Sequence, residues 1–149
     1  MTALSFKKQF VEPIRRGLVS AYPDLAGLRP KRQTIRAGHV VIDRLEARSV
    51  KGRLLARLGE PITFYCGMRT KHCFKIGAGK CTVITGIQIE VEASRIIVGG
   101  KRVPQKEIDD FARRDGFADW KEMALFWYGE HHAAMNDFRG VLIEWEPIA

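Results

Sequence analysis

The sequence predicts an α+β fold in which a small β-barrel is flanked by helices. Many short segments carry the alternating or β-branched residues of strands, and helical patterns lie near the start and the end of the chain. The length of 149 residues is usual for one domain, and no repeat, low-complexity tract or linker divides it. We therefore expect a single domain over residues 1–149.

The first elements should be a strand over residues 4–6 and a helix after it. Apolar residues recur at four-residue steps, as on one side of a helix, at Phe10, Ile14 and Leu18. Pro13 is poorly tolerated inside a helix, so we expect the helix to begin near Val11 or to bend there. Gly17 and the turn signal that follows should end it, which leaves residues 20–30 as a loop.

The middle of the chain is typical of a series of strands. Alternation, or β-branched and aromatic residues, marks residues 34–36, 39–42, 62–66, 81–91, 94–98, 101–103 and 141–145. Gly99 and Gly100 separate two of these segments and are a strong signal for a two-residue hairpin. Alternation also turns one of the adjacent rings Phe64 and Tyr65 inward, and Tyr65 is the better surface candidate.

Two further helices should lie between that hairpin and the last strand. Pro104 suits a first helical turn, and Gly116 suits a C-terminal stop. Asp119 can cap the next helix, with Glu122 three residues later as in a capping box. That helix carries an apolar stripe at helical spacing, formed by Trp120, Met123, Ala124 and Trp127. We expect this stripe to pack in the core; a platform for stacking bases is the alternative.

The charge of the chain is divided unequally. Residues 1–80 hold 17 Lys and Arg against 5 Asp and Glu, a net of +12, whereas residues 81–149 have a net of −4. A basic segment of this kind favours a polyanion such as RNA, because neutralising phosphates releases condensed counterions. The alternative is a solvated basic surface that keeps the protein in solution.

Composition argues against several other classes. No apolar run approaches the roughly 20 residues that span a bilayer, and the first residues lack a secretory signal, so we expect a cytoplasmic protein without a membrane partner. Cys66, Cys73 and Cys81 are odd in number and clustered, unlike a disulfide framework. Their spacing fits no common zinc pattern, so ordinary half-buried thiols are expected and no metal or other cofactor is predicted.

The densest basic stretch runs over residues 29–36. If residues 32–36 are extended, Arg32, Thr34 and Arg36 share one face, and two guanidinium groups around a hydroxyl can bind phosphate or carboxylate. Lys31 points away from that face unless the chain bends after Pro30. The alternative is an exposed edge strand guarded by positive charge.

This stretch resembles the G-x-K-x-x-T-x-R signature of ASCH domains. Lys31, Thr34 and Arg36 occupy its last three named positions, and Arg29 stands where the family has glycine. Further segments are similar, in order and spacing, to bacterial and phage-borne members of the family: residues 58–65, 67–71, 115–117 and 140–145. The resemblance covers nearly the whole chain.

The resemblance implies a PUA-like β-barrel with a cleft between barrel and helices. Some small ASCH proteins are amidohydrolases that remove the acyl group from N4-acetylcytidine, with a Lys, a Thr and a Glu at the proposed site. The first two match Lys31 and Thr34, and the carboxylate matches Asp115, which is one methylene shorter. In that role Thr34 would be the nucleophile, Lys31 the base and Asp115 the acid–base partner.

Two hypotheses follow for function. The first is an RNA- or nucleoside-binding domain with a basic cleft around Lys31–Arg36, in which Arg32 and Arg36 contact the ligand. A second basic point at Arg69 and Lys71 would hold phosphates while Tyr65 offers a ring for stacking. The alternative is a hydrolase, either the amidohydrolase described above or a ribonuclease, that uses Lys31, Thr34 and Asp115. The sequence leaves open whether the protein is an enzyme.

Overall fold

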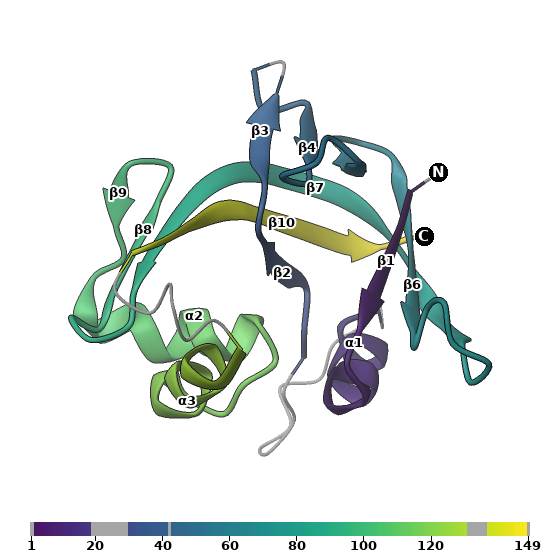
Figure 1. Ribbon diagram of the computed structural model, residues 1–149. Helices are drawn as coiled ribbons and strands as arrows, with labels where there is room; N and C mark the ends of the chain where they lie inside the picture. Colours follow the sequence, from purple (N-terminus) through teal and green to yellow (C-terminus); the bar gives the residue numbers. More distant parts are fainter. Residues whose placement is uncertain (1, 19–29, 42, 131–136, 149) are drawn as a thin grey trace.

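The computed structural model describes residues 2–18, 30–41, 43–130 and 137–148 and has a mixed α+β fold, which confirms the predicted class (Figure 1). The predicted loop 20–30 lies outside the described residues except for Pro30. In chain order the elements are β1 (Thr2–Phe6), the short 3-10 helix η1 (Lys8–Phe10), α1 (Val11–Gly17), β2 (Gln33–Arg36), β3 (His39–Val41), β4 (Glu46–Arg48), β5 (Leu54–Arg57), β6 (Pro61–Cys66), β7 (Phe74–Glu90), β8 (Arg95–Val98), β9 (Lys101–Arg102), η2 (Gln105–Glu107), α2 (Ile108–Arg114), α3 (Trp120–Glu130) and β10 (Phe138–Pro147).

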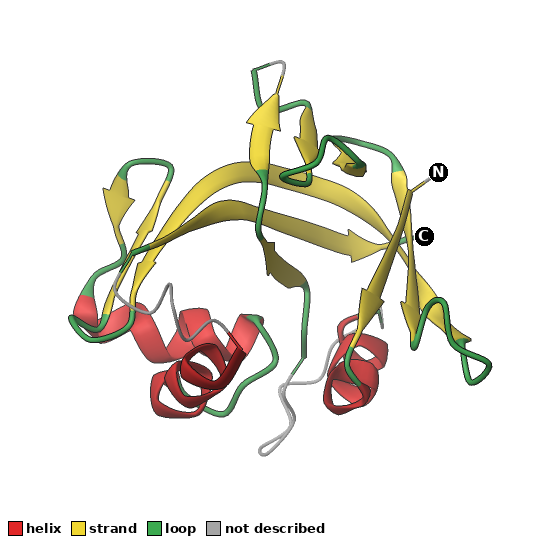
Figure 2. Cartoon of the chain, viewed as in Figure 1, coloured by secondary structure: helices red, strands yellow, loops and turns green. Residues whose placement is uncertain are grey.

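The main sheet has seven strands, five of them in the order β1-β6-β7-β10-β2. β1 runs parallel to β6 and the remaining pairs are antiparallel. The long strand β7 pairs with β6 in its first half and with β8 in its second, while β10 follows its other edge. Together β7 and β10 form an arch, with α1 beneath one end of it and α2 and α3 beneath the other (Figure 2).

The predicted small barrel is not confirmed. β3, β4 and β5 form a separate three-stranded sheet, and strand pairing among the described residues does not close either sheet. β1 and β2 are the two ends of the main strand order, and each pairs with a single neighbour. A side chain bridges these two edges instead, because the Arg36 Nη2 donates a hydrogen bond to the backbone oxygen of Ser5 at 2.7 Å.

The helix and turn signals are largely confirmed. Pro13 lies in the first turn of α1, where its missing N–H costs nothing, and α1 begins at Val11 as predicted. The Asp119 carboxylate accepts a hydrogen bond from the Glu122 N–H at 2.9 Å, as in the predicted cap of α3. Gly99 and Gly100 both have positive φ, 58° and 83°, which the hairpin between β8 and β9 requires.

The core lies between the arch of the main sheet and the helices. Its largest fully buried side chains include Phe64, Phe111 and Phe117. Trp120, Met123 and Trp127 of α3 are buried as well, which confirms the expected packing of the apolar stripe. No helix among the described residues is long and apolar enough to cross a membrane.

Candidate functional site

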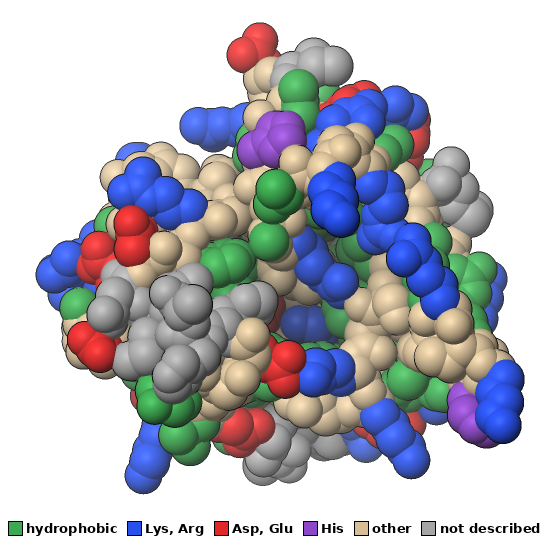
Figure 3. Space-filling model, viewed as in Figure 1, with side chains coloured by type: hydrophobic (Ala, Val, Ile, Leu, Met, Phe, Trp, Pro, Cys, Tyr) green, Lys and Arg blue, Asp and Glu red, His purple; other side chains and the backbone are tan. Residues whose placement is uncertain are grey.

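A pocket of about 560 Å³ opens between the two edge strands of the main sheet and the helix α3. Figure 3 shows it as a hollow near the centre of one face, with Lys and Arg side chains at its bottom. All three predicted catalytic residues, Lys31, Thr34 and Asp115, line this pocket, together with the predicted ligand-binding residue Arg36. The other lining residues are Ser5, Phe6, Lys7, Lys8, Phe10, Ile35, Ala37, Cys66, Gly67, Phe126, Trp127 and Glu130.

Lys31 reaches the pocket because it lies before β2 rather than in it. Its N–H donates to the backbone oxygen of Pro13 at 2.8 Å, and it forms an isolated antiparallel bridge with Asp115. The strand alternation that would turn Lys31 away therefore does not apply to it. Gly17 allows this close approach of α1, since a Cβ there would collide with the Lys31 backbone oxygen.

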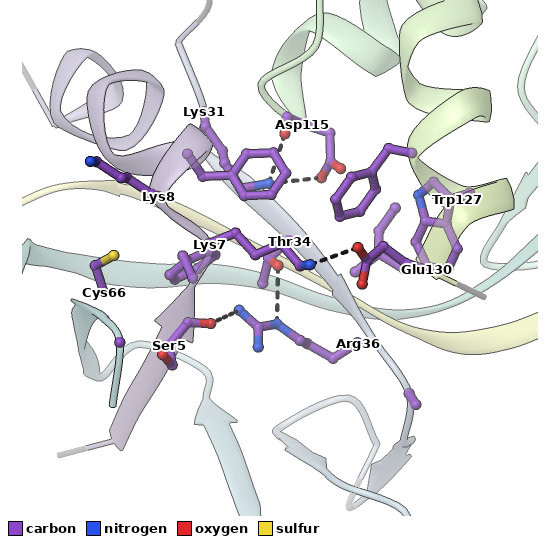
Figure 4. A pocket seen from close by; sticks show the side chains of 16 residues that line it. Ser5, Lys7, Lys8, Lys31, Thr34, Arg36, Cys66, Asp115, Trp127 and Glu130 are labelled. Carbon is purple, nitrogen blue, oxygen red and sulfur yellow. Dashed lines mark hydrogen bonds and ion pairs between the residues drawn. The ribbon is translucent and has the colours of Figure 1, made fainter. Parts of the chain in front are cut away.

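Lys31 and Asp115 form a buried pair at the base of the pocket. The Lys31 Nζ donates to the Asp115 backbone oxygen at 2.7 Å and lies 3.4 Å from Oδ1 (Figure 4). The two residues are only 2% and 5% exposed. Burial lowers the pKa of Lys31, against the opposing effect of Asp115, and burial raises the pKa of Asp115, against the opposing effect of Lys31. Burial thus disfavours both charged forms, and the contact between the two groups favours them.

Thr34 and Arg36 follow two residues apart on β2 and are joined by a hydrogen bond. The Arg36 Nε donates to the Thr34 Oγ1 at 3.2 Å, and the guanidinium carbon lies 4.6 Å from the centroid of the Phe6 ring. Burial lowers the pKa of Arg36 to about 10, so it remains a cation at neutral pH. Thr34 is 4% exposed, and its hydroxyl is oriented by a fixed positive charge.

Aromatic rings form much of the remaining wall. Phe6 and Phe10 come from the β1–η1 segment, and Phe126 and Trp127 come from α3. Phe10 and Phe126 pack edge to face, with ring centroids 5.4 Å apart. The Lys31 Nζ lies 4.6 Å from the Phe10 centroid, so a ring also covers the buried amine. The pocket therefore combines an apolar wall with a few fixed polar groups.

An ion pair spans the mouth of the pocket. The Lys7 Nζ, just after β1, lies 2.6 Å from the Glu130 Oε1 at the end of α3 (Figure 4). Both side chains are partly exposed, at 54% and 38%. This contact joins two elements on opposite walls of the pocket.

Four of the predicted ligand-binding residues do not line this pocket. The Arg32 Nε donates to the backbone oxygen of Gly17 at 2.7 Å, which turns its side chain toward α1. Tyr65 is partly exposed on β6 while its neighbour Phe64 is fully buried, as the alternation predicts. Arg69 and Lys71 are exposed in the turn between β6 and β7, whose first residue Gly67 borders the pocket.

The cysteines do not form a metal site with other described residues. Cys66 and Cys81 are buried thiols and Cys73 is an exposed one. Burial raises the pKa of Cys81 to about 11, which keeps it a neutral thiol. No group of three or more His, Cys, Asp or Glu side chains within the described ranges could hold a metal ion. His131 and His132 lie outside those ranges.

Sequence reasoning missed several residues of the pocket. Lys7 and Lys8 directly follow the first strand, and a basic pair at a strand end is a signal that could have placed them near a ligand. Glu130, at the end of α3, carried no such signal. Trp127 was assigned to the core, and it is both buried and part of the pocket wall.

Comparisons with protein-family models, with curated proteins and with solved structures find no match to this chain.

Proposed function

We propose that the protein binds a nucleoside, either free or as one unstacked nucleotide of an RNA, in the pocket around Lys31–Arg36. The observation that carries this proposal is the pocket itself, a hollow of about 560 Å³ with aromatic walls and a polar base. That volume is within the range of about 300–1,000 Å³ usual for sites of small molecules. It suits one nucleoside and is too small for a double helix.

The walls and the base of the pocket suit the two kinds of surface that a nucleoside presents. Phe126 and Phe10 offer faces and edges on which a planar base can pack. The Thr34 hydroxyl, the Lys31 amine and the Asp115 carboxyl offer donors and acceptors for the edge of the base or for ribose hydroxyls. The formal net charge of +8 favours approach of a polyanionic RNA.

We also propose that the fold is a PUA-like barrel of the ASCH type. The order and spacing of the motifs around Lys31, Thr34 and Arg36 resemble ASCH domains, and a PUA-like barrel is the fold which that resemblance implies. The two edge strands β1 and β2 face the same pocket, and Arg36 bridges them. The arrangement is compatible with a barrel-like sheet that is held open at its ligand site.

Hydrolysis of an N4-acylated cytidine is a second candidate, favoured by the presence of Lys31, Thr34 and Asp115 in one pocket. In its neutral form the Lys31 amine would take the proton of the Thr34 hydroxyl as Oγ1 attacks the acyl carbonyl. The same proton would pass to the departing cytidine amine, and water would then release the acyl group from Thr34. Arg36 and the lowered pKa of Lys31 support these roles. A ribonuclease using the same groups is the further alternative.

The binding proposal is tested by titrating the protein with cytidine and with a short single-stranded RNA, following Trp fluorescence. We expect saturable binding that Phe126→Ala weakens by about 1–3 kcal/mol, the usual worth of a stacked base. Leu125→Ala is the matched control, because Leu125 is 67% exposed on the same helix and does not line the pocket. If both variants bind equally well, with their folds verified by circular dichroism, the ligand does not bind in this pocket.

The hydrolytic candidate is tested with N4-acetylcytidine, following its conversion to cytidine by chromatography. Thr34→Val removes the hydroxyl at nearly constant shape and should lower the rate by about 10²-fold or more, as loss of a nucleophile or its base does. Thr34→Ser keeps the hydroxyl and should retain most of the activity. Full activity in Thr34→Val would refute the catalytic assignment, and binding without turnover would leave the protein a binding domain.

A further inference from the structure

The charges that line the pocket do not balance. Four cations, Lys7, Lys8, Lys31 and Arg36, face two carboxylates, Asp115 and Glu130. Each carboxylate already has a cation of its own, since Lys31 lies 3.4 Å from Asp115 and Lys7 lies 2.6 Å from Glu130. Lys8 and Arg36 form no ion pair with any carboxylate of the described residues. The cations that line the pocket therefore exceed its carboxylates by two, although the charge of Asp115 also acts on Arg36.

Arg36 is the better placed of these two cations. Its Nε is bound to Thr34, its Nη2 to the Ser5 backbone oxygen, and its guanidinium lies against the Phe6 ring. These contacts fix the plane of the guanidinium, while its Nη1 has no hydrogen-bond partner in the described part of the chain. A fixed, largely buried cation with a free donor is a preorganised anion site, because its ordering cost is met before the ligand arrives.

A second arginine increases the positive potential at the same place. Arg53 lies at the end of the turn between β4 and β5, its side chain is exposed, and among the described residues that side chain has no acidic partner. Its positive charge acts on Arg36 and lowers the pKa of that residue, whereas the charge of Asp115, the larger of these two effects, raises it. Figure 3 shows Lys and Arg side chains continuing from the hollow along its upper rim, on the side of β3–β5.

We propose that the ligand of this pocket carries a phosphate group, which Arg36 binds with the help of Arg53, so that the substrate class is nucleotides rather than bare nucleosides. The inference rests on the proposed function for the nucleoside half of the ligand. The two carboxylates oppose a phosphate less than unpaired ones would, because Lys31 lies beside Asp115 and Lys7 beside Glu130. A phosphate suits the site better than a single carboxylate, since it offers several acceptor oxygens to cations that approach from different elements.

The test compares the dissociation constants of cytidine, cytidine 5′-monophosphate, cytidine 3′-monophosphate and inorganic phosphate at low salt. One of the two monophosphates should bind about tenfold more tightly than cytidine, through charge-assisted hydrogen bonds. That preference should shrink as salt is raised, because screening weakens the phosphate contact and leaves stacking unaffected. Arg53→Gln should lower several-fold the ratio of the dissociation constant of cytidine to that of the monophosphate. Lys101→Gln, an exposed cation on β9 outside this pocket, is the matched control and should change nothing.

The possible outcomes separate this inference from the proposed function. If cytidine binds and neither monophosphate binds more tightly, the phosphate site is refuted and the nucleoside proposal stands. If the monophosphates and inorganic phosphate bind while cytidine alone does not, the phosphate site is supported and the nucleoside proposal fails. Binding of none of the four would overturn both. An equal loss of preference in Arg53→Gln and Lys101→Gln would mean that only overall charge attracts the phosphate, which also refutes the site.

Discussion

Two carboxylates of the described residues, Asp115 and Glu46, each lie beside basic side chains, yet their pKa values shift in opposite directions. Asp115 meets Lys31 at the base of the pocket, where both side chains are less than a tenth exposed. Glu46 meets Arg48 and Arg57 on the small sheet β3–β5, where the Glu46 side chain is also only 9% exposed but the arginine side chains are 34% and 44% exposed. The pKa of Asp115 is raised by burial, whereas the pKa of Glu46 is lowered, chiefly by its hydrogen bond from Arg57.

The difference shows that surroundings, and not residue types, decide what a charged pair does. Water solvates the arginines of the small sheet, so their charges cost little free energy. Two hydrogen-bond donors hold the Glu46 carboxylate in its charged form. At the base of the pocket the groups have lost their water, and the contacts of Asp115 with Lys31 and Gln33 only partly replace it. Burial moves both members of the pocket pair toward their neutral forms, whereas the Glu46 cluster favours a charged carboxylate and joins β4 to β5.

The largest expected effect is on stability when one member of the buried pair is removed. Lys31→Met or Asp115→Leu alone should lower the free energy of unfolding by about 3–5 kcal/mol, because each leaves a buried charge without its partner. The double variant should recover much of that loss, since no isolated charge remains. Urea denaturation of the four proteins gives the coupling directly.

The small sheet provides the matched cycle for this prediction. Glu46→Gln, Arg57→Gln and their double variant should each change stability far less, and their coupling should be smaller than that of the buried pair. Equal coupling energies in the two cycles would show that the Lys31–Asp115 pair is no more strongly coupled than the Glu46–Arg57 pair.

A smaller effect is expected from the backbone contact that positions Lys31. Gly17→Ala should destabilise the protein by about 1–3 kcal/mol, because the new methyl group would collide with the Lys31 backbone oxygen. The same change should weaken binding of cytidine by displacing Lys31. Gly86→Ala is the control, since a Cβ at that strand position meets no other atom within 4 Å. Thermal denaturation of both variants tests this, and an equally stable Gly17→Ala would show that α1 does not constrain the site.

Much of the fold could be predicted because its signals are local. Helix starts, the Gly99-Gly100 hairpin and the alternating half of β7 are set by neighbouring residues. The first half of β7 was missed because Gly77, Gly79 and flanking lysines weaken the strand signal. β4 and β5 were missed for a related reason: each is short, and their apolar residues are too few to show a period. Closure of a barrel depends on distant edges, which no local pattern reports.

The site could be predicted only in part, since it is assembled from segments far apart in the chain. The resemblance to ASCH domains brought Lys31, Thr34 and Asp115 together, and the structure has all three in one pocket. Alternation placed Arg32 beside Arg36, yet β2 begins after Arg32, whose side chain turns to Gly17 instead. Glu130 reaches the pocket, and the charge of Arg53 acts on Arg36, only through tertiary packing, so their sequence neighbours gave no hint of either.

The smallest expected effect is a difference in how the two clusters respond to acid. The pKa of Glu46 lies below its ordinary value of 4.5, so its contribution to stability is complete above pH 4.5 and is lost as pH falls through the lower folded value. The stability of the wild type should therefore fall toward that of Glu46→Gln in that pH range. Asp115 has the opposite sign, because a pKa above 3.8 means that its charged form costs stability at higher pH and that the cost disappears as pH falls.

Lys31→Met should make this second response visible. Lys31 opposes the rise in the pKa of Asp115, so its removal raises that pKa further and moves the protonation of Asp115 toward neutral pH. On acidification from pH 7 toward 4, Lys31→Met should gain stability relative to wild type, while over the lower range wild type declines toward Glu46→Gln. Urea midpoints measured along a pH series compare the two slopes. If the two differences in urea midpoint change with pH in the same direction, both carboxylates are stabilised in their charged form. Asp115 would then not be a group that holds a proton for a ligand.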